Sequence, residues 1–232
     1  MKRKLIFIIS LPLALPFYGC SSTIEIRHSG DRKNLIFEKP LKFTYNLELT
    51  EYISKEMRKG LNISEFTPRP EIILKNYGEK DLLGVQYEMR IKYENGLGWE
   101  LKVAEIYYEE IHSMLSRGFF DQKTFEATIY DVGIHEVLHA YYDYKYKEEH
   151  QKILENNDDY VTIGKFDHCK MIETGDLKKY TDIVDKHFNN QGIAQRDSLE
   201  RTEYACNDSN EEIKKILKKS KKEDKRYKCL LK

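Results

Sequence analysis

The sequence predicts an α+β domain whose sheet comes early in the chain and whose helices follow. With 232 residues, the chain is long enough for one medium-sized domain with a hydrophobic core. Between residues 85 and 103, apolar and polar residues alternate on both sides of an Asn95-Gly96 turn, which is typical of a β-hairpin with one buried face. From about residue 104 the pattern is mostly helical. Strands followed by helices are typical of the α+β class.

The remaining elements are predicted from local signals. Residues 49–61 read "LTEYISKEMRKGL" and predict a helix, with Thr50 as its N-cap and Gly60 near its end. Residues 70–76 predict a strand. Loops are expected near Gly118, over residues 155–167 and over residues 189–192.

The first residues, "MKRKLIFIISLPLALPFYGCSS", have the pattern of an export signal: basic residues, an apolar stretch, then small residues. The apolar stretch is shorter than the roughly 20 residues that span a bilayer as a helix. Gly19-Cys20 resembles the lipobox of bacterial lipoproteins, in which cleavage leaves a lipid-modified cysteine. We therefore expect an envelope lipoprotein, periplasmic or surface-facing, anchored to the membrane through lipid on Cys20. The expected parts are a signal peptide (1–19), a tether (20–39), a catalytic domain (40–213) and a basic tail (214–232).

Charge and cysteine content exclude some function classes. Lys plus Arg and Asp plus Glu number 39 each, so no net field would attract a nucleic acid, and none is expected as a partner. Beyond Cys20 the chain has Cys169, Cys206 and Cys229, which allow at most one disulfide. Because they form no C-x-x-C pair, a cysteine zinc site is not expected.

Residues 134–142, "IHEVLHAYY", contain an H-E-x-x-H motif. On a helix, residues four apart share a face, so His135 and His139 can bind one zinc ion while Glu136 reaches a water beside it. Glu136 would then act as the general base of a hydrolase. The competing interpretation is an amphipathic helix that buries its apolar residues and exposes the histidines and glutamate to water.

Two acidic residues are candidates for supporting the ligands. Asp131 precedes His135 by four residues, and Asp143 follows His139 by four. Either carboxylate could accept the second ring N–H of a ligating histidine.

The third ligand stays open on spacing alone. The compact motif that continues H-x-x-G-x-x-H is absent, because Tyr142 and Lys145 occupy its Gly and His positions. A glutamate ligand would be Glu203 or Glu200. A histidine ligand would be His150 or His168.

A resemblance favours one of these candidates. "HEVLHAYYDY" resembles the HE-x-x-HAY helix of SprT-like zinc metallopeptidases, and "FDHCKM" (166–171) resembles their later segment, in which a third histidine completes the site. The similarity extends over about residues 124–188. It implies a zincin-like fold, Zn²⁺ bound by His135, His139 and His168, Glu136 as the catalytic residue, and a protein or peptide substrate. The export signal does not fit the family's DNA-associated members, so no DNA role is expected.

The expected function is therefore that of an exported, lipid-anchored zinc metalloprotease that hydrolyses peptide bonds. The alternative, from a different class, is a non-catalytic envelope lipoprotein that uses the same scaffold to bind a partner, with a structural metal or none.

Overall fold

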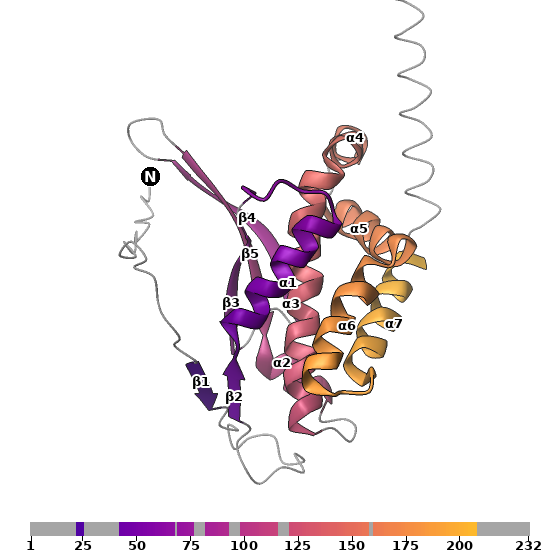
Figure 1. Ribbon diagram of the computed structural model, residues 1–232. Coiled ribbons are helices and arrows are strands. Elements are labelled where there is room, and N and C mark those ends of the chain that lie inside the picture. The colour runs from indigo at the N-terminus through magenta and orange to yellow at the C-terminus, as the bar shows by residue number, and fades with distance from the viewer. Residues whose placement is uncertain are drawn as a thin grey trace, which may run out of the picture.

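The computed structural model describes residues 22–25, 42–67, 69–76, 82–92, 98–115, 121–157 and 160–207. In these residues a three-stranded sheet packs against helices that form most of the rest of the fold (Figure 1). The predicted α+β class is confirmed.

The main sheet contains β3 (Glu71–Lys75), β4 (Gly84–Lys92) and β5 (Gly98–Tyr107), in the order β3-β5-β4. β4 and β5 form the predicted hairpin, antiparallel with Lys92 opposite Gly98. The turn at Asn95-Gly96 lies outside the described residues. β3, a strand as predicted, pairs in parallel with β5, so β4 is an edge strand.

A second, two-stranded sheet pairs β1 (Ser22–Glu25) with β2 (Lys42–Tyr45) in an antiparallel register. β1 falls in the segment expected to be a tether, so at least these four residues take part in a strand pair.

The first helix, α1 (Leu47–Gly60), begins earlier than the sequence suggested. Its N-cap is Asn46, whose side-chain oxygen accepts a hydrogen bond from the backbone N–H of Leu49 at 3.0 Å. The prediction of Thr50 as N-cap was wrong. Thr50 instead lies in the first turn, where its hydroxyl donates back to the carbonyl of Asn46.

Six further helices follow in the described chain: α2 (Tyr108–Leu115), α3 (Gln122–Lys145), α4 (Lys147–Asn157), α5 (Tyr160–Thr174), α6 (Asp176–Phe188) and α7 (Ile193–Asn207). The predicted loop at 189–192 is confirmed, since Asn189 ends α6 with φ 51° and Gly192 has φ 75°.

The loop predicted over residues 155–167 was wrong, because α5 begins at Tyr160. Polar residues before it and Gly164 within it hide the helical pattern. Ile163 and Phe166 nevertheless lie three residues apart and are buried together with Ile153 of α4. This contact between helices stabilises a segment that has little local helical signal.

The 24-residue helix α3 lies between the sheet and helices α6 and α7 (Figure 1). It is buried almost along its whole length, including Phe125, Leu138 and Tyr141. A helix that is buried on all sides shows no one-sided apolar stripe. The H-E-x-x-H motif therefore lies on a helix whose apolar residues belong to the core.

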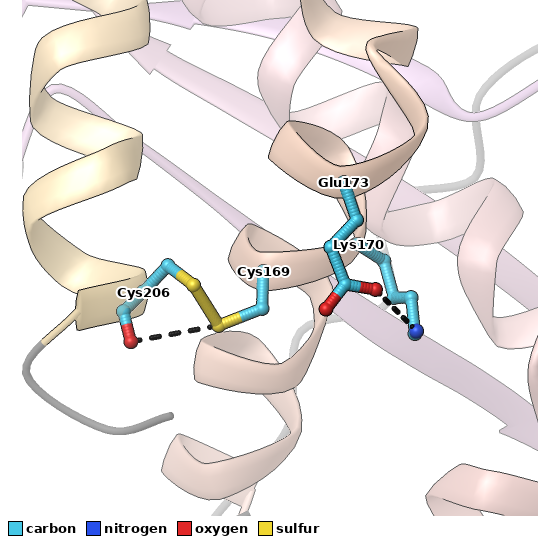
Figure 2. Close-up of a disulfide and its surroundings, with 4 residues drawn as sticks. All are labelled: Cys169, Lys170, Glu173 and Cys206. Carbon is cyan, nitrogen blue, oxygen red and sulfur yellow. Dashed lines mark hydrogen bonds and ion pairs between the residues drawn. A yellow bond between two sulfur atoms is a disulfide. The ribbon is translucent and has the colours of Figure 1, made fainter. Parts of the chain in front are cut away.

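Cys169 of α5 and Cys206 of α7 form a disulfide, with their Cα atoms 4.7 Å apart (Figure 2). Both belong to the small apolar cluster that α4, α5 and α7 share. Figure 2 also shows the ion pair between Lys170, which directly follows Cys169, and Glu173 on the same helix. The disulfide joins the helix of His168 to the last described helix.

The predicted signal peptide, Cys20, Gly118, Cys229 and the basic tail lie outside the described residues. Among the helices that are described, none combines the length and the apolar character needed to cross a membrane.

Candidate metal centre

Three histidines point their Nε2 atoms at one another. His135 and His139 come from α3, and His168 comes from α5. The Nε2 atoms of His135 and His168 are 3.0 Å apart, and that of His139 is 3.2 Å from each of the others. Each imidazole nitrogen has one in-plane direction for a proton or a lone pair. Three such atoms cannot all satisfy one another, whereas a cation between them would accept all three lone pairs.

Two of the second ring nitrogens have partners that fix the tautomer. Nδ1 of His139 lies 2.9 Å from Oδ2 of Asp167, and Nδ1 of His135 lies 3.3 Å from the Thr202 hydroxyl. That hydroxyl donates to the carbonyl of Ser198, so its oxygen is left to accept from His135. Both histidines then hold a proton on Nδ1 and a lone pair on Nε2, as metal ligands require.

The electrostatics of two of the three rings, His135 and His168, also favour a cation. Burial and the neighbouring His139 lower the pKa of His168 to about 3, and burial lowers that of His135 well below its ordinary value. Both rings are neutral at physiological pH. Burial acts to lower the pKa of His139 as well, but the hydrogen bond that its ring donates to Asp167 and the charge of that carboxylate outweigh burial and raise the pKa.

The donor set and its spacing fit zinc. Zinc in proteins takes imidazole nitrogens at about 2.0–2.1 Å in a tetrahedron, which keeps the nitrogens about 3.3 Å apart. The three nitrogen separations of 3.0–3.2 Å are close to this value. Within the described residues, these three histidines form a group whose ligand atoms are close enough together to hold one metal ion. Three protein ligands leave one tetrahedral position open.

Glu136 lies beside the histidines and is buried, with 8% of its surface exposed. Burial raises the pKa of its carboxyl to about 7, although the charge of His139 acts to lower it. This carboxyl is therefore close to the pKa at which a group can both take and give a proton near neutral pH. His139 is 9% exposed. The competing interpretation, in which the helix shows these polar residues to water, does not match their burial.

The histidines and Glu136 open onto a cleft of about 1200 Å³. One wall is the edge strand β4 with the residues before it (82–88), and the opposite wall comes from α5 and α7. Gly84 of β4 touches the motif helix closely: a Cβ there would lie 3.0 Å from Cγ of Glu136. Because Gly84 has no side chain, strand β4 can pack directly against Glu136.

The other residues considered as a third ligand lie elsewhere. His150 is buried, but its ring nitrogens face Asp143 at 3.1 Å and Asp167 at 2.8 Å. Glu200 and Glu203 are exposed on α7. Only His168 joins His135 and His139 among the described candidates.

The two expected supporting carboxylates were assigned wrongly. Asp143 contacts His150 and Lys102 in place of a ligating histidine. Asp131 is fully buried, and neither carboxylate oxygen has a hydrogen-bond partner among the described residues. Burial raises its pKa well above the ordinary value. A full turn of α3 toward the N-terminus carries Asp131 away from the cleft.

Sequence reasoning missed Asp167 and Thr202, which contact the second ring nitrogens of the candidate ligands His139 and His135. Asp167 directly precedes His168, and that adjacency was the one signal available. Thr202 lies on a helix distant in sequence and gave no signal.

Comparison of the chain with protein-family models, with curated proteins and with solved structures finds no match. The case for a function therefore depends on the site geometry.

Proposed function

We propose that this protein is a zinc-dependent peptidase in which His135, His139 and His168 bind the ion and Glu136 is the general base. The observation that supports this most is the convergence of three imidazole Nε2 atoms within 3.0–3.2 Å, next to a buried carboxylate on an open cleft. A purely structural metal site would need neither the cleft nor the carboxylate.

The chemistry follows from the residues that surround the open position. A zinc ion held by His135, His139 and His168 would supply a water of lowered pKa and would polarise a substrate carbonyl. Glu136 takes a proton from the attacking water and passes it to the leaving amine. Burial in the cleft raises the pKa of its carboxyl, which favours a group that accepts and then returns a proton. Asp167 and Thr202 hold His139 and His135 with their lone pairs toward the ion.

The shape of the cleft supports a peptide as substrate. At about 1200 Å³ it exceeds the roughly 300–1,000 Å³ of typical small-molecule pockets. Its β4 wall is an edge strand that pairs with β5 within the described residues. The outer edge of such a strand offers backbone N–H and C=O groups to an extended chain.

The protein would act in the cell envelope, anchored through lipid on Cys20. The Cys169–Cys206 disulfide supports this location, since disulfides persist in oxidising compartments and are rare in the cytosol.

Metal-dependent hydrolysis tests the proposal. The chain without residues 1–19 is incubated with an unfolded protein substrate as purified, after chelation, and after zinc is restored. Cleavage should stop with the chelator and return with zinc. Glu136→Gln should retain zinc and lose activity by about 10²–10⁴-fold, the usual value of general acid–base catalysis.

Glu126→Gln is the matched control. Glu126 lies on the same helix, where it accepts a hydrogen bond from Gln122, and it does not line the cleft. It should leave hydrolysis unchanged. If zinc-loaded wild type cleaves no peptide substrate, or if both variants behave alike, the peptidase proposal is wrong and the non-catalytic lipoprotein is favoured.

A further inference from the structure

The carboxylate that holds His139 belongs to a row of ionisable side chains that is buried at the end nearest the histidines. Starting from His139, the row continues through Asp167 (2.9 Å), His150 (2.8 Å), Asp143 (3.1 Å), Lys102 (2.7 Å) and Glu88 (2.8 Å). It connects helices α3, α5 and α4 with strands β5 and β4. From Asp167 to Glu88, negative and positive groups follow one another.

His150 is the central cation of this row. It is 6% exposed, and each of its ring nitrogens faces a carboxylate oxygen. Both imidazole nitrogens are donors only when the ring is protonated, so this arrangement requires an imidazolium. Burial acts to lower its pKa, but Asp143 and Asp167 outweigh burial and raise the pKa to about 9.

Asp167 is shared between two histidines through different oxygens. Oδ1 accepts from His150 and Oδ2 accepts from His139. Because Asp167 is 2% exposed, water does not compete for either oxygen. The direction in which Oδ2 points is therefore set by the bond that His150 makes to Oδ1.

Stability alone is a weak reason for such a row. Burying paired charges costs desolvation energy that their attraction only roughly offsets, and apolar replacements are often neutral or stabilising. A row that ends on the Nδ1 of a metal-ligand candidate has a positioning use that an isolated ion pair lacks.

We propose that His150 is a positioning residue of the metal centre, which orients Asp167 so that His139 presents its Nε2 lone pair to the ion. Asp143 holds the other side of the His150 ring, and Lys102 holds Asp143 in turn. His150 is thus a support for a ligand two groups away. The inference depends on the metal centre of the proposed function and is independent of hydrolysis.

Metal affinity and ligand field test the inference together. Zn²⁺ affinity is measured by chelator competition for wild type, His150→Ala, His150→Gln and Asp143→Asn. Loss of the direct partner of a ligating histidine typically costs about 10–100-fold in metal affinity. His150→Ala leaves Asp167 in place and loosens it, so its cost should be at the low end of this range, about tenfold. His150→Gln keeps one donor for Asp167 and should recover part of the loss. Asp143→Asn, one step further from the metal, should cost less than His150→Ala.

The Co²⁺ absorption spectrum separates positioning from folding. Each variant is saturated with Co²⁺, so that only folded, loaded protein contributes to the visible bands. His150→Ala should shift these bands, because the orientation of His139 changes. His187→Ala is the matched control, since His187 is exposed on the last turn of α6. It should change neither affinity nor spectrum.

The inference is overturned if His150→Ala and Asp143→Asn, both folded by circular dichroism, keep wild-type zinc affinity and wild-type Co²⁺ bands. It is equally overturned if wild type binds neither metal. These measurements do not depend on hydrolysis. If the protein binds zinc but cleaves no substrate, the proposed peptidase activity is wrong, while the role of His150 is still tested by the affinity and the spectrum.

Discussion

Gly84 and Glu136 lie against each other across the boundary between the sheet and the motif helix. A Cβ on Gly84 would lie 3.0 Å from Cγ of Glu136, 2.9 Å from Cγ1 of Val132 and 2.8 Å from the backbone oxygen of Glu105. The backbone oxygen cannot move aside as a flexible side chain would. The edge strand β4 and the candidate base therefore stay at a separation that only glycine permits.

Gly84→Ala should separate catalysis from metal binding. The added methyl must push β4 from α3, which should cost about 1–3 kcal/mol of stability, as overpacking usually does. Hydrolysis should fall because Glu136 and the strand wall move, while zinc affinity stays near wild type. Denaturant unfolding, chelator competition and a cleavage assay measure the three effects.

Gly164→Ala is the stability control for that variant. No atom lies within 4 Å of a Cβ at Gly164, which is in the interior of helix α5. The change should stabilise the protein by up to about 1 kcal/mol through helix propensity. Equal stability for both alanine variants would contradict the close contact at Gly84.

The third ligand is tested by truncating each candidate in turn. His168→Ala should lower zinc affinity far more than His150→Ala or Glu203→Ala, because its Nε2 lies 3.0 Å from that of His135. Glu203→Ala should have no effect, since that side chain is exposed. Wild-type zinc content in His168→Ala, with loss in Glu203→Ala, would make the site a glutamate-type zinc centre.

The charge of His150 should make its contribution to stability depend on pH. Its pKa in the folded protein, about 9, lies above the ordinary value of 6.5, because Asp143 and Asp167 outweigh burial. The stabilisation is therefore fully present below an ordinary histidine pKa and is lost as the pH rises through about 9.

This dependence is measured as the difference in unfolding free energy between wild type and His150→Gln, with chelator present. Taking the difference cancels the titration of other groups that both proteins share. The gap should be larger at about pH 6 than at about pH 10. A gap that does not change with pH would mean that His150 is not charged between the two carboxylates.

Membrane attachment is tested at Cys20. The Gly19-Cys20 pair follows an apolar segment too short to span a bilayer, so Cys20→Ser should move the protein from the membrane fraction to the soluble fraction. If the variant still fractionates with membranes, another anchor such as the basic tail must hold it.

Local patterns predicted the elements whose signals are local. The alternation of residues 85–103 gave the hairpin, and the spacing of His135 and His139 placed both on one helical face. The parallel pairing of β3 with β5 was not predicted, because strand pairing is a non-local choice.

The sequence predicted the histidines and the glutamate of the candidate site, but it did not predict the residues that hydrogen-bond to those histidines. His168 was favoured through a family resemblance, although residues 155–167 directly before it were wrongly expected to be a loop. Asp167 and Thr202 act through contacts 28 and 67 residues distant in sequence, which no spacing rule reaches. His150 was considered as a ligand, and the structure instead brings it to the far side of Asp167.

The most direct test of the metal centre is a crystal structure of the zinc-loaded protein, with anomalous scattering recorded on both sides of the zinc edge. The account predicts one anomalous peak, bound by the Nε2 atoms of His135, His139 and His168, with its open side facing Glu136 and the cleft. No peak between these three nitrogens, or a peak bound by Glu203 or His150, would contradict it.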